Sequence, residues 1–196
     1  MEKEDRETRP TRAVIGLSGA SGGIYGVRVL ETLAAMPDVE VHLIVTEAAG
    51  TLVPQETGRS LEEVLDLADK VWDSRRMESP LASGSFIVDA MAVVPCSVST
   101  VAKVAHGIGD TLLTRACAVT LKERRRLVIV AREMPLSTVD LRNLTTLSEA
   151  GAVVAVASPS FYTGPETVDD LVDLVAGRVI QLMGFDPGPL LRRYVP

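Results

Sequence analysis

Short apolar runs alternate with amphipathic stretches along most of this chain, and that alternation constrains its fold more than any other feature. We predict strands at the apolar runs, residues 13–17, 39–46, 91–95, 127–131 and 152–157. We predict helices where apolar residues recur with helical spacing, at residues 24–36, 47–56, 61–68, 98–105, 110–124, 137–149 and 167–183. Regular alternation of this kind favours a parallel sheet covered by helices on both faces. The sequence therefore predicts an α/β fold, a Rossmann-like doubly wound parallel sheet in a single domain.

The composition fits such a domain and excludes several classes of protein. Hydrophobic residues make up 46% of the 196 positions, and this content suits strands that are buried on both faces. The net charge of −6 argues against non-specific nucleic-acid binding, which needs a basic surface. Cys96 and Cys117 lack the spacing of a zinc site, so we expect no metal and two buried thiols in a reducing cytoplasm. We expect residues 1–12 to be a flexible tail and residues 13–196 to form the domain.

Small and polar residues follow the predicted strands, at the edge where parallel sheets bind ligands. The first loop, residues 16–23, reads GLSGASGG. Small residues let a ligand approach the backbone, and amides at the start of the next helix attract a phosphate. Ser18 and Ser21 add hydroxyls that could bond a phosphate or a heterocycle. The glycine spacing is not the GxGxxG of dinucleotide sites, and a tight turn without a ligand stays an alternative.

Two further loops have the same character. Residues 82–86 read ASGSF, and residues 95–100 read PCSVST. The hydroxyls of the second suit helix capping and equally suit hydrogen bonds to a polar ligand. We interpret three such loops at strand ends as one ligand site. We also expect residues 73–84 to be a loop, and Asp110 to be the N-cap of the helix that follows it.

Charged residues and a tyrosine stand at or near the predicted strand ends in the second half of the chain. Arg132 and Glu133 directly follow the apolar run 127–131, Lys122 lies near a helix end, and Tyr162 follows the last predicted strand. Such residues make a site for a phosphate or pyrophosphate leaving group if they converge. The alternative for residues 122–126 is a solvated helix C-terminus that complements the helix dipole, and we adopt it for residues 124–126.

Taken together, these segments resemble the UbiX family of flavin prenyltransferases over residues 13–184. The matching stretches are GASG at 19–22, ASGS at 82–85, PCS at 95–97, LKERR at 121–125, RE at 132–133 with PL at 135–136, FY at 161–162 and Arg178. The resemblance implies an enzyme that alkylates reduced FMN with dimethylallyl monophosphate. The prenylated FMN would then serve a partner decarboxylase. It also implies a homo-oligomer, often a dodecamer.

The resemblance assigns roles to individual residues. Those expected to contact FMN are Gly19, Ser21, Thr46, Ser97, Thr100 and Arg115. Those expected to hold the prenyl phosphate are Lys122, Arg132, Tyr162 and Arg178, with Lys122 and Tyr162 supplied by a neighbouring subunit. Glu133 is expected to contact and protonate the phosphate, while Ser21 and Glu56 are expected to handle protons as the flavin is alkylated.

Three positions depart from the family pattern. Met77 stands near a place where many relatives have a Trp that would face the prenyl group, so we expect its thioether to line the donor site. Ala118 replaces a common Asp and Asp140 a common His, and we expect these two to alter local pairing only.

Two other functions are weighed against prenyl transfer. One is an accessory subunit that binds FMN without chemistry. The other is a flavin-dependent cysteine decarboxylase, whose relatives carry a catalytic His and a PxMN segment. No such segment is found here, and the histidines His42 and His106 do not stand where that base is expected.

Overall fold

A computed structural model of the chain describes residues 9–191. Its strands are β1 (Thr11–Leu17), β2 (Val39–Val45), β3 (Lys70–Asp73), β4 (Ala90–Cys96), β5 (Arg126–Ala131) and β6 (Val153–Val156). Its α-helices are α1 (Gly23–Ala34), α2 (Glu47–Thr57), α3 (Leu61–Leu65), α4 (Val98–Ala105), α5 (Leu112–Lys122), α6 (Thr138–Glu149) and α7 (Val168–Met183). Short 3-10 helices lie at Pro80–Ala82 and Gly188–Leu190.

The strands form one six-stranded sheet in the order β3-β2-β1-β4-β5-β6, and every neighbouring pair is parallel. The order reverses between β1 and β4, so the topological switch point, where doubly wound folds bind ligands, lies between them. All seven residues of β4 are buried, as expected for a strand in the middle of a sheet that is covered on both sides. The predicted fold class is confirmed.

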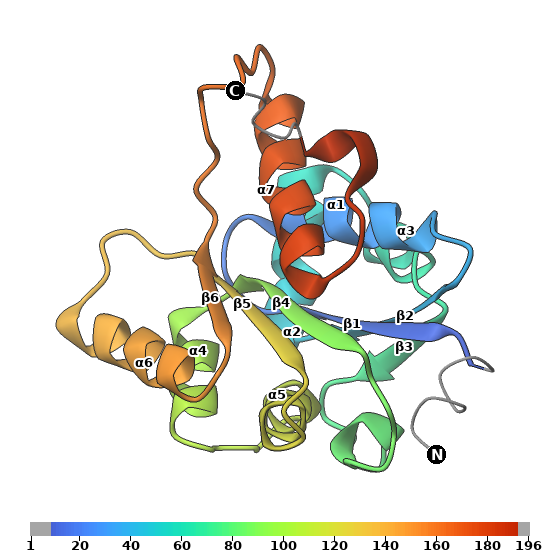
Figure 1. Ribbon diagram of the computed structural model, residues 1–196, viewed down its shortest axis with the longest axis vertical. Coiled ribbons are helices and arrows are strands. Elements are labelled where there is room, and N and C mark those ends of the chain that lie inside the picture. The colour runs from blue at the N-terminus through green and yellow to red at the C-terminus, as the bar shows by residue number, and fades with distance from the viewer. Residues whose placement is uncertain (1–8, 192–196) are drawn as a thin grey trace.

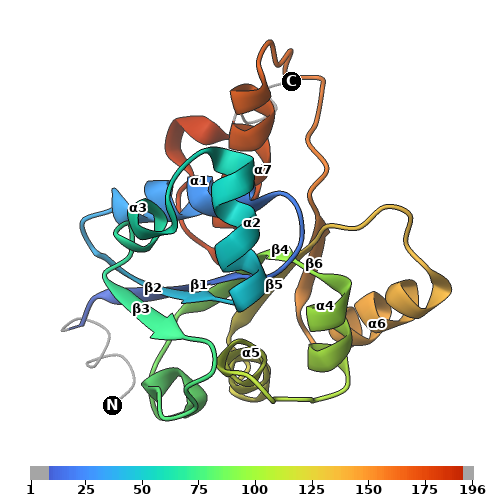
Figure 2. The same cartoon turned by 180° about the vertical axis from the view of Figure 1, so that it is seen from behind.

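The helices cover both faces of the sheet (Figures 1 and 2). Helices α1, α2, α3 and α7 pack on one face, and α4, α5 and α6 pack on the other. Each face has its own core of buried aliphatic side chains, and alternate residues of the central strands contribute to one or the other. This arrangement leaves the carboxyl ends of β1, β4 and β5 free to position a site.

The helix boundaries agree with the sequence pattern to within about two residues, except that α3 ends at Leu65 rather than at residue 68. The cap of α5 also differs. Asp110 was expected to cap this helix, but the cap is Thr111, whose hydroxyl accepts from the Thr114 amide at 3.3 Å. The Thr114 hydroxyl in turn accepts from the Thr111 amide at 3.2 Å, which completes a capping box. The carboxylate of Asp110 instead bonds Lys103 of α4 at 2.7 Å. The Asp110 prediction was therefore wrong by one residue.

The loop predicted for residues 73–84 contains the last residue of β3, Asp73, and the 3-10 helix Pro80–Ala82. The predicted N-terminal tail also differs from expectation. The strand β1 begins at Thr11, because Asp89 accepts from the Arg12 amide at 2.8 Å and from Arg9 at 2.8 and 2.9 Å. Residues 9–12 therefore do not belong to the tail predicted for residues 1–12, and residues 1–8 lie outside the described part. The short edge strand β3 was not predicted.

β3 is attached to its neighbour partly through a buried histidine. The Trp72 indole donates to Nδ1 of His42 at 3.0 Å, and the two rings stack with centroids 5.8 Å apart. The proton of the neutral ring is therefore on Nε2, which faces Glu40 at 3.4 Å. Phe86 closes another side, edge to face. Burial lowers the pKa of His42, and this outweighs the opposing charge of Glu40.

This environment predicts a specific loss of stability in acid. Below about pH 6.5 the unfolded chain takes up a proton on His42, and the folded chain resists that protonation. The contribution of His42 to the free energy of unfolding is therefore full above that pH, and it is lost as the pH drops through the lowered folded pKa. Urea unfolding at fixed protein concentration, followed by the fluorescence of the single Trp, measures the slope. His42→Gln should remove the part of the slope that lies just below pH 6.5. An unchanged slope in that variant would contradict the assignment to His42.

Candidate active site

The loop after β1 is tied to the end of β4 by Ser18. Its hydroxyl donates to the Pro95 carbonyl at 3.0 Å and accepts from the Ser97 amide at 2.8 Å. The side chain is buried, at 2% exposure. Ser18 therefore joins the two strands at the switch point, rather than offering its hydroxyl to a ligand as the sequence suggested.

The N-terminus of α1 already holds an anion from the chain itself. The amides of Gly22 and Gly23 both donate to Oε2 of Glu56, at 2.8 and 2.7 Å. Gly22 caps the helix with a φ of 98° and offers no side chain, so these amides would otherwise lack a partner. The two amides that were predicted to bind a phosphate therefore already donate to the Glu56 carboxylate.

The surroundings of Glu56 keep it ionised. Burial by itself would raise its pKa, but hydrogen bonds from the Ser21 hydroxyl and the two glycine amides, with the positive charge of Arg132, lower the pKa below its ordinary value of 4.5. Ser21, Glu56 and Arg132 therefore lie together. A hydroxyl beside a stable carboxylate is an arrangement that can accept and relay a proton.

Further hydroxyls converge on the same edge from the starts of α2 and α4. Thr46 caps α2, and Ser97 caps α4 with its oxygen 3.0 Å from that of Thr100. A Cβ on Gly19 would lie 2.5 Å from the Cβ of Ala48, so the first loop passes close to the start of α2. Gly19, Thr46, Ser97 and Thr100 thus all lie at the switch point. Their contact with FMN stays a prediction.

The residues after β5 and β6 form an adjoining hollow. Arg132 and Glu133 line a cavity of about 190 Å³, and Tyr162 and Arg178 line one of about 420 Å³. Both cavities include Val156 in their walls, so the two are neighbours. The Cγ atom of Arg132 also lies 3.8 Å from the Cβ position of Gly22, beside the Glu56 carboxylate. Arg132 therefore stands between the switch point and the cation-lined hollow.

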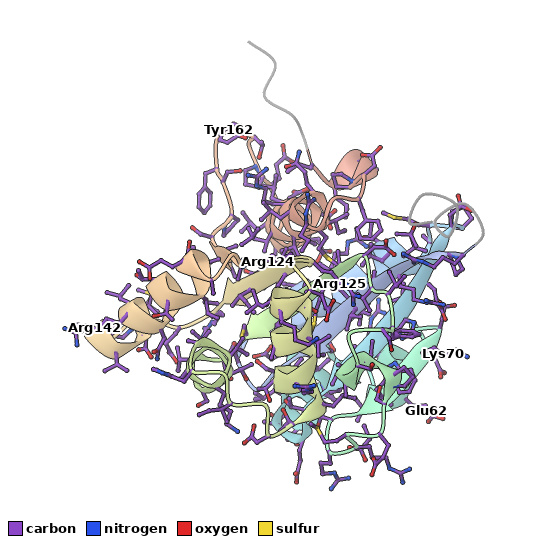
Figure 3. The ribbon with its side chains drawn as sticks, turned by 60° about the horizontal axis from the view of Figure 1, so that its bottom comes forward. Glu62, Lys70, Arg124, Arg125, Arg142 and Tyr162 are labelled. Carbon is purple, nitrogen blue, oxygen red and sulfur yellow. The ribbon has the colours of Figure 1, made fainter. Side chains whose placement is uncertain are left out.

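Two of the predicted donor-site residues lie elsewhere in the chain. Lys122 ends α5, at the opposite end of β5 from Arg132, and the six residues of β5 span about 17 Å. Met77 follows the edge strand β3, four strands away from β5 and so about 19 Å from it. In Figure 3, Arg124 and Arg125, which follow α5 in the chain, lie apart from Tyr162 in the loop after β6. Neither Lys122 nor Met77 can meet Arg132 within one chain.

Arg115 lies in the first half of α5 and is engaged with a second predicted loop. Its Nε donates to the Ala82 carbonyl at 3.1 Å, which holds the ASGS segment against the helix. Arg125 holds the same segment, although we had interpreted residues 124–126 as a solvated helix end. No local pattern in the sequence links Arg125 to its acceptors, the carbonyls of Phe86 and Gly84, which lie 39 and 41 residues earlier in the chain.

Two surveys of the described residues concern membranes and metals. No helix within residues 9–191 is both long and apolar enough to cross a bilayer. In the same part of the chain, no group of three or more His, Cys, Asp or Glu side chains could hold a metal ion.

Comparison with known proteins places this geometry in a family. The family model described as Flavoprotein matches residues 1–180. The flavin prenyltransferase UbiX of Thermoplasma acidophilum is 50% identical over 160 residues, which cover 82% of this chain and 87% of the relative.

Two solved structures superpose closely on this chain. A UbiX-like protein of Escherichia coli O157:H7, described as a dodecameric FMN-dependent decarboxylase, is 41% identical with a TM-score of 0.92, covering 95% of this chain and 100% of that one. AnUbiX (PadA1), in complex with FMN and dimethylallyl pyrophosphate, is 40% identical with a TM-score of 0.93, covering 96% and 99%. The chain therefore belongs to the flavoprotein family and, within it, to the UbiX-type flavin prenyltransferases.

Proposed function

We propose that this protein transfers a dimethylallyl group from dimethylallyl monophosphate to reduced FMN, and that the prenylated FMN serves a partner decarboxylase. The observation that carries the proposal is the place of Arg132. It lies beside the Ser21–Glu56 pair at the switch point, and it lines the hollow next to the one that contains Tyr162 and Arg178. A flavin and a phosphate donor could thus be held next to each other.

The residues at the switch point fit FMN. The hydroxyls of Thr46, Ser97 and Thr100 stand at the starts of two helices, where amides and hydroxyls bind a phosphate or a sugar. The loop at Gly19 is free of bulky side chains. Arg115 would approach from the start of α5. Reduced FMN supplies the nucleophilic nitrogen and the neighbouring ring carbon that receive the five-carbon unit.

The remaining residues have roles that follow from their charge and position. Arg132 and Arg178, with Lys122 and the Tyr162 hydroxyl of a neighbouring subunit, would bind the donor phosphate and stabilise its charge as it leaves. Glu133 would exchange a proton with that phosphate. The Glu56 carboxylate, bonded to Ser21, would take the proton that ring closure releases. Whether Met77 lines the donor site stays a prediction.

The site is completed by a second copy of the chain, since Lys122 is too far from Arg132 to join it within one chain. We propose a homo-oligomer, and the dodecameric Escherichia coli relative supports this. The segments after β5 and β6 extend from the body (Figure 1). Both segments expose apolar side chains. Met134, Phe161 and Tyr162 are 90%, 70% and 71% exposed, which favours contact with another protein surface.

Mixing two inactive variants tests the shared site. Lys122→Ala and Arg132→Ala should each lose most activity, because each removes a cation from every site. Subunits of the two, unfolded together and refolded as mixed oligomers, should regain part of it, since some sites then receive Lys122 and Arg132 from different chains. The product formed per subunit is the measurement, with each variant refolded alone as control. Absence of recovery in proven mixed oligomers would contradict a shared site.

The function itself is tested by the mass of the flavin. Anaerobic incubation with reduced FMN and dimethylallyl monophosphate should yield a flavin heavier by one five-carbon unit. Unchanged flavin on a folded, FMN-binding protein would favour the accessory-subunit alternative instead. We place the reaction in the cytoplasm, since reduced flavin and the two free buried thiols are both suited to a reducing compartment.

A further inference from the structure

Arg125 clamps the ASGS segment, and the proposed reaction gives this arginine no role so far. Arg125 donates from Nη1 to the Phe86 carbonyl at 2.8 Å and from Nη2 to the Gly84 carbonyl at 2.6 Å. The two acceptors are two residues apart, and the rigid fork of a guanidinium can serve both at once. The side chain of Arg125 is partly buried in doing so. The segment is thus fastened to the end of α5 and the start of β5.

The clamped backbone lies directly against Lys122. A Cβ on Gly84 would be 2.1 Å from Oε1 of Glu123 and 2.8 Å from Nζ of Lys122, so a side chain at this position would displace the ends of both side chains. Lys122 and Glu123 form an ion pair. The hydrogen bond from Lys122, with the charges of Lys122 and Arg125, lowers the pKa of Glu123. Glu123 therefore contacts Lys122 and the Gly84 backbone position, and it feels the charge of Arg125.

We propose that Arg125 is a positioning residue for Lys122 in prenyl transfer. By fixing the carbonyls of Gly84 and Phe86 it fixes the surface on which the Lys122–Glu123 pair rests. The long side chain of Lys122 is thereby held in place before the donor phosphate binds. That phosphate binds in the site of a neighbouring subunit. The inference rests on the proposed function, in which Lys122 contacts that phosphate.

The test separates donor binding from flavin binding. Arg125→Gln should raise the KM for dimethylallyl monophosphate about tenfold, because the ammonium is no longer pre-placed. The Kd for FMN and kcat at saturating donor should change little. Arg125→Lys, which keeps the charge but cannot serve two carbonyls as a fork, should fall between. The matched control is Arg124→Gln, which removes the same charge from the exposed neighbouring residue and should leave the donor KM unchanged.

Amide hydrogen exchange gives a readout that does not need activity. Exchange of the segment 83–86 should quicken in Arg125→Gln and not in Arg124→Gln. If Arg125→Gln does not fold, Gly84→Ala takes its place, since its methyl group displaces the Lys122–Glu123 pair while Arg125 stays, and it should raise the donor KM alone.

The outcomes distinguish the inference from the function on which it rests. An active wild type in which both Arg125→Gln and Gly84→Ala leave the donor KM unchanged would overturn the inference and leave the function standing. Equal losses in FMN affinity and donor affinity would also overturn it, because the clamp would then be only a part of the general fold. A wild type that makes no heavier flavin would overturn both.

Discussion

Glu56→Gln is expected to lower the rate of prenyl transfer by a hundredfold to ten-thousandfold while FMN still binds. Glutamine keeps an oxygen for the Gly22 and Gly23 amides, so the loop at α1 should hold its shape. It cannot take a proton as a carboxylate does. Single-turnover formation of the heavier flavin measures the rate, and fluorescence titration of FMN measures binding.

The pH dependence and a control sharpen this result. Because the pKa of Glu56 lies below 4.5, the carboxylate is present at and above that pH and is lost only as the pH falls through the lowered value. The wild type should therefore show an acid limb below pH 4.5 that Glu56→Gln lacks. Glu47→Gln, on the exposed first turn of the same helix, should behave as wild type. A Glu56→Gln enzyme with normal rate would show that the proton goes elsewhere.

Gly26→Ala, a substitution away from the site, is expected to lower the free energy of unfolding by about 3 kcal/mol. A methyl group on Gly26 would lie 2.3 Å from the Val94 carbonyl oxygen and 2.4 Å from a methyl carbon of Leu17. The first of these is backbone, so α1 itself must move away from the sheet. Urea unfolding at fixed protein concentration measures the loss.

Gly50→Ala in α2 is the matched helical control. Its nearest neighbour would be a Leu61 methyl carbon at 3.4 Å, an ordinary contact. Alanine is the better helix former by about 0.5–1 kcal/mol, so this variant should be slightly more stable than the wild type. If Gly26→Ala were as stable as Gly50→Ala, the close contact between α1 and β4 would be wrong.

The alternation of apolar and amphipathic segments predicted most of the fold, because burial on both faces leaves a local mark on each strand. β3 left no such mark. It is a four-residue edge strand in which Lys70 and Asp73 are exposed, and what attaches it, the bond from Trp72 to His42, joins residues 30 apart. The Asp110 error has a similar cause, since two capping residues stand side by side and only the contact with Lys103 separates them.

The site was predicted in part, by residue types and by family resemblance. The hydroxyls of Thr46, Ser97 and Thr100 lie at the switch point, whereas the ASGS segment, expected in the same site, runs along α5 to Lys122. The bonds from Gly22 and Gly23 to Glu56 span 34 and 33 residues, and no local pattern announces them. Arg125 was interpreted wrongly for the same reason, because its acceptors lie 39 and 41 residues earlier. The distance between Lys122 and Arg132 follows only from the direction of α5 and β5.

The carboxylate bound at the start of α1 has a consequence for inhibition by simple salts. An anion that is covalently part of the chain is present at a fixed high local concentration, and a dissolved sulfate or phosphate ion cannot easily displace it. Such ions should therefore compete with the prenyl donor for Arg132 and Arg178. They should also compete with the phosphate of FMN for its own binding site. They should leave the first turn of α1 untouched.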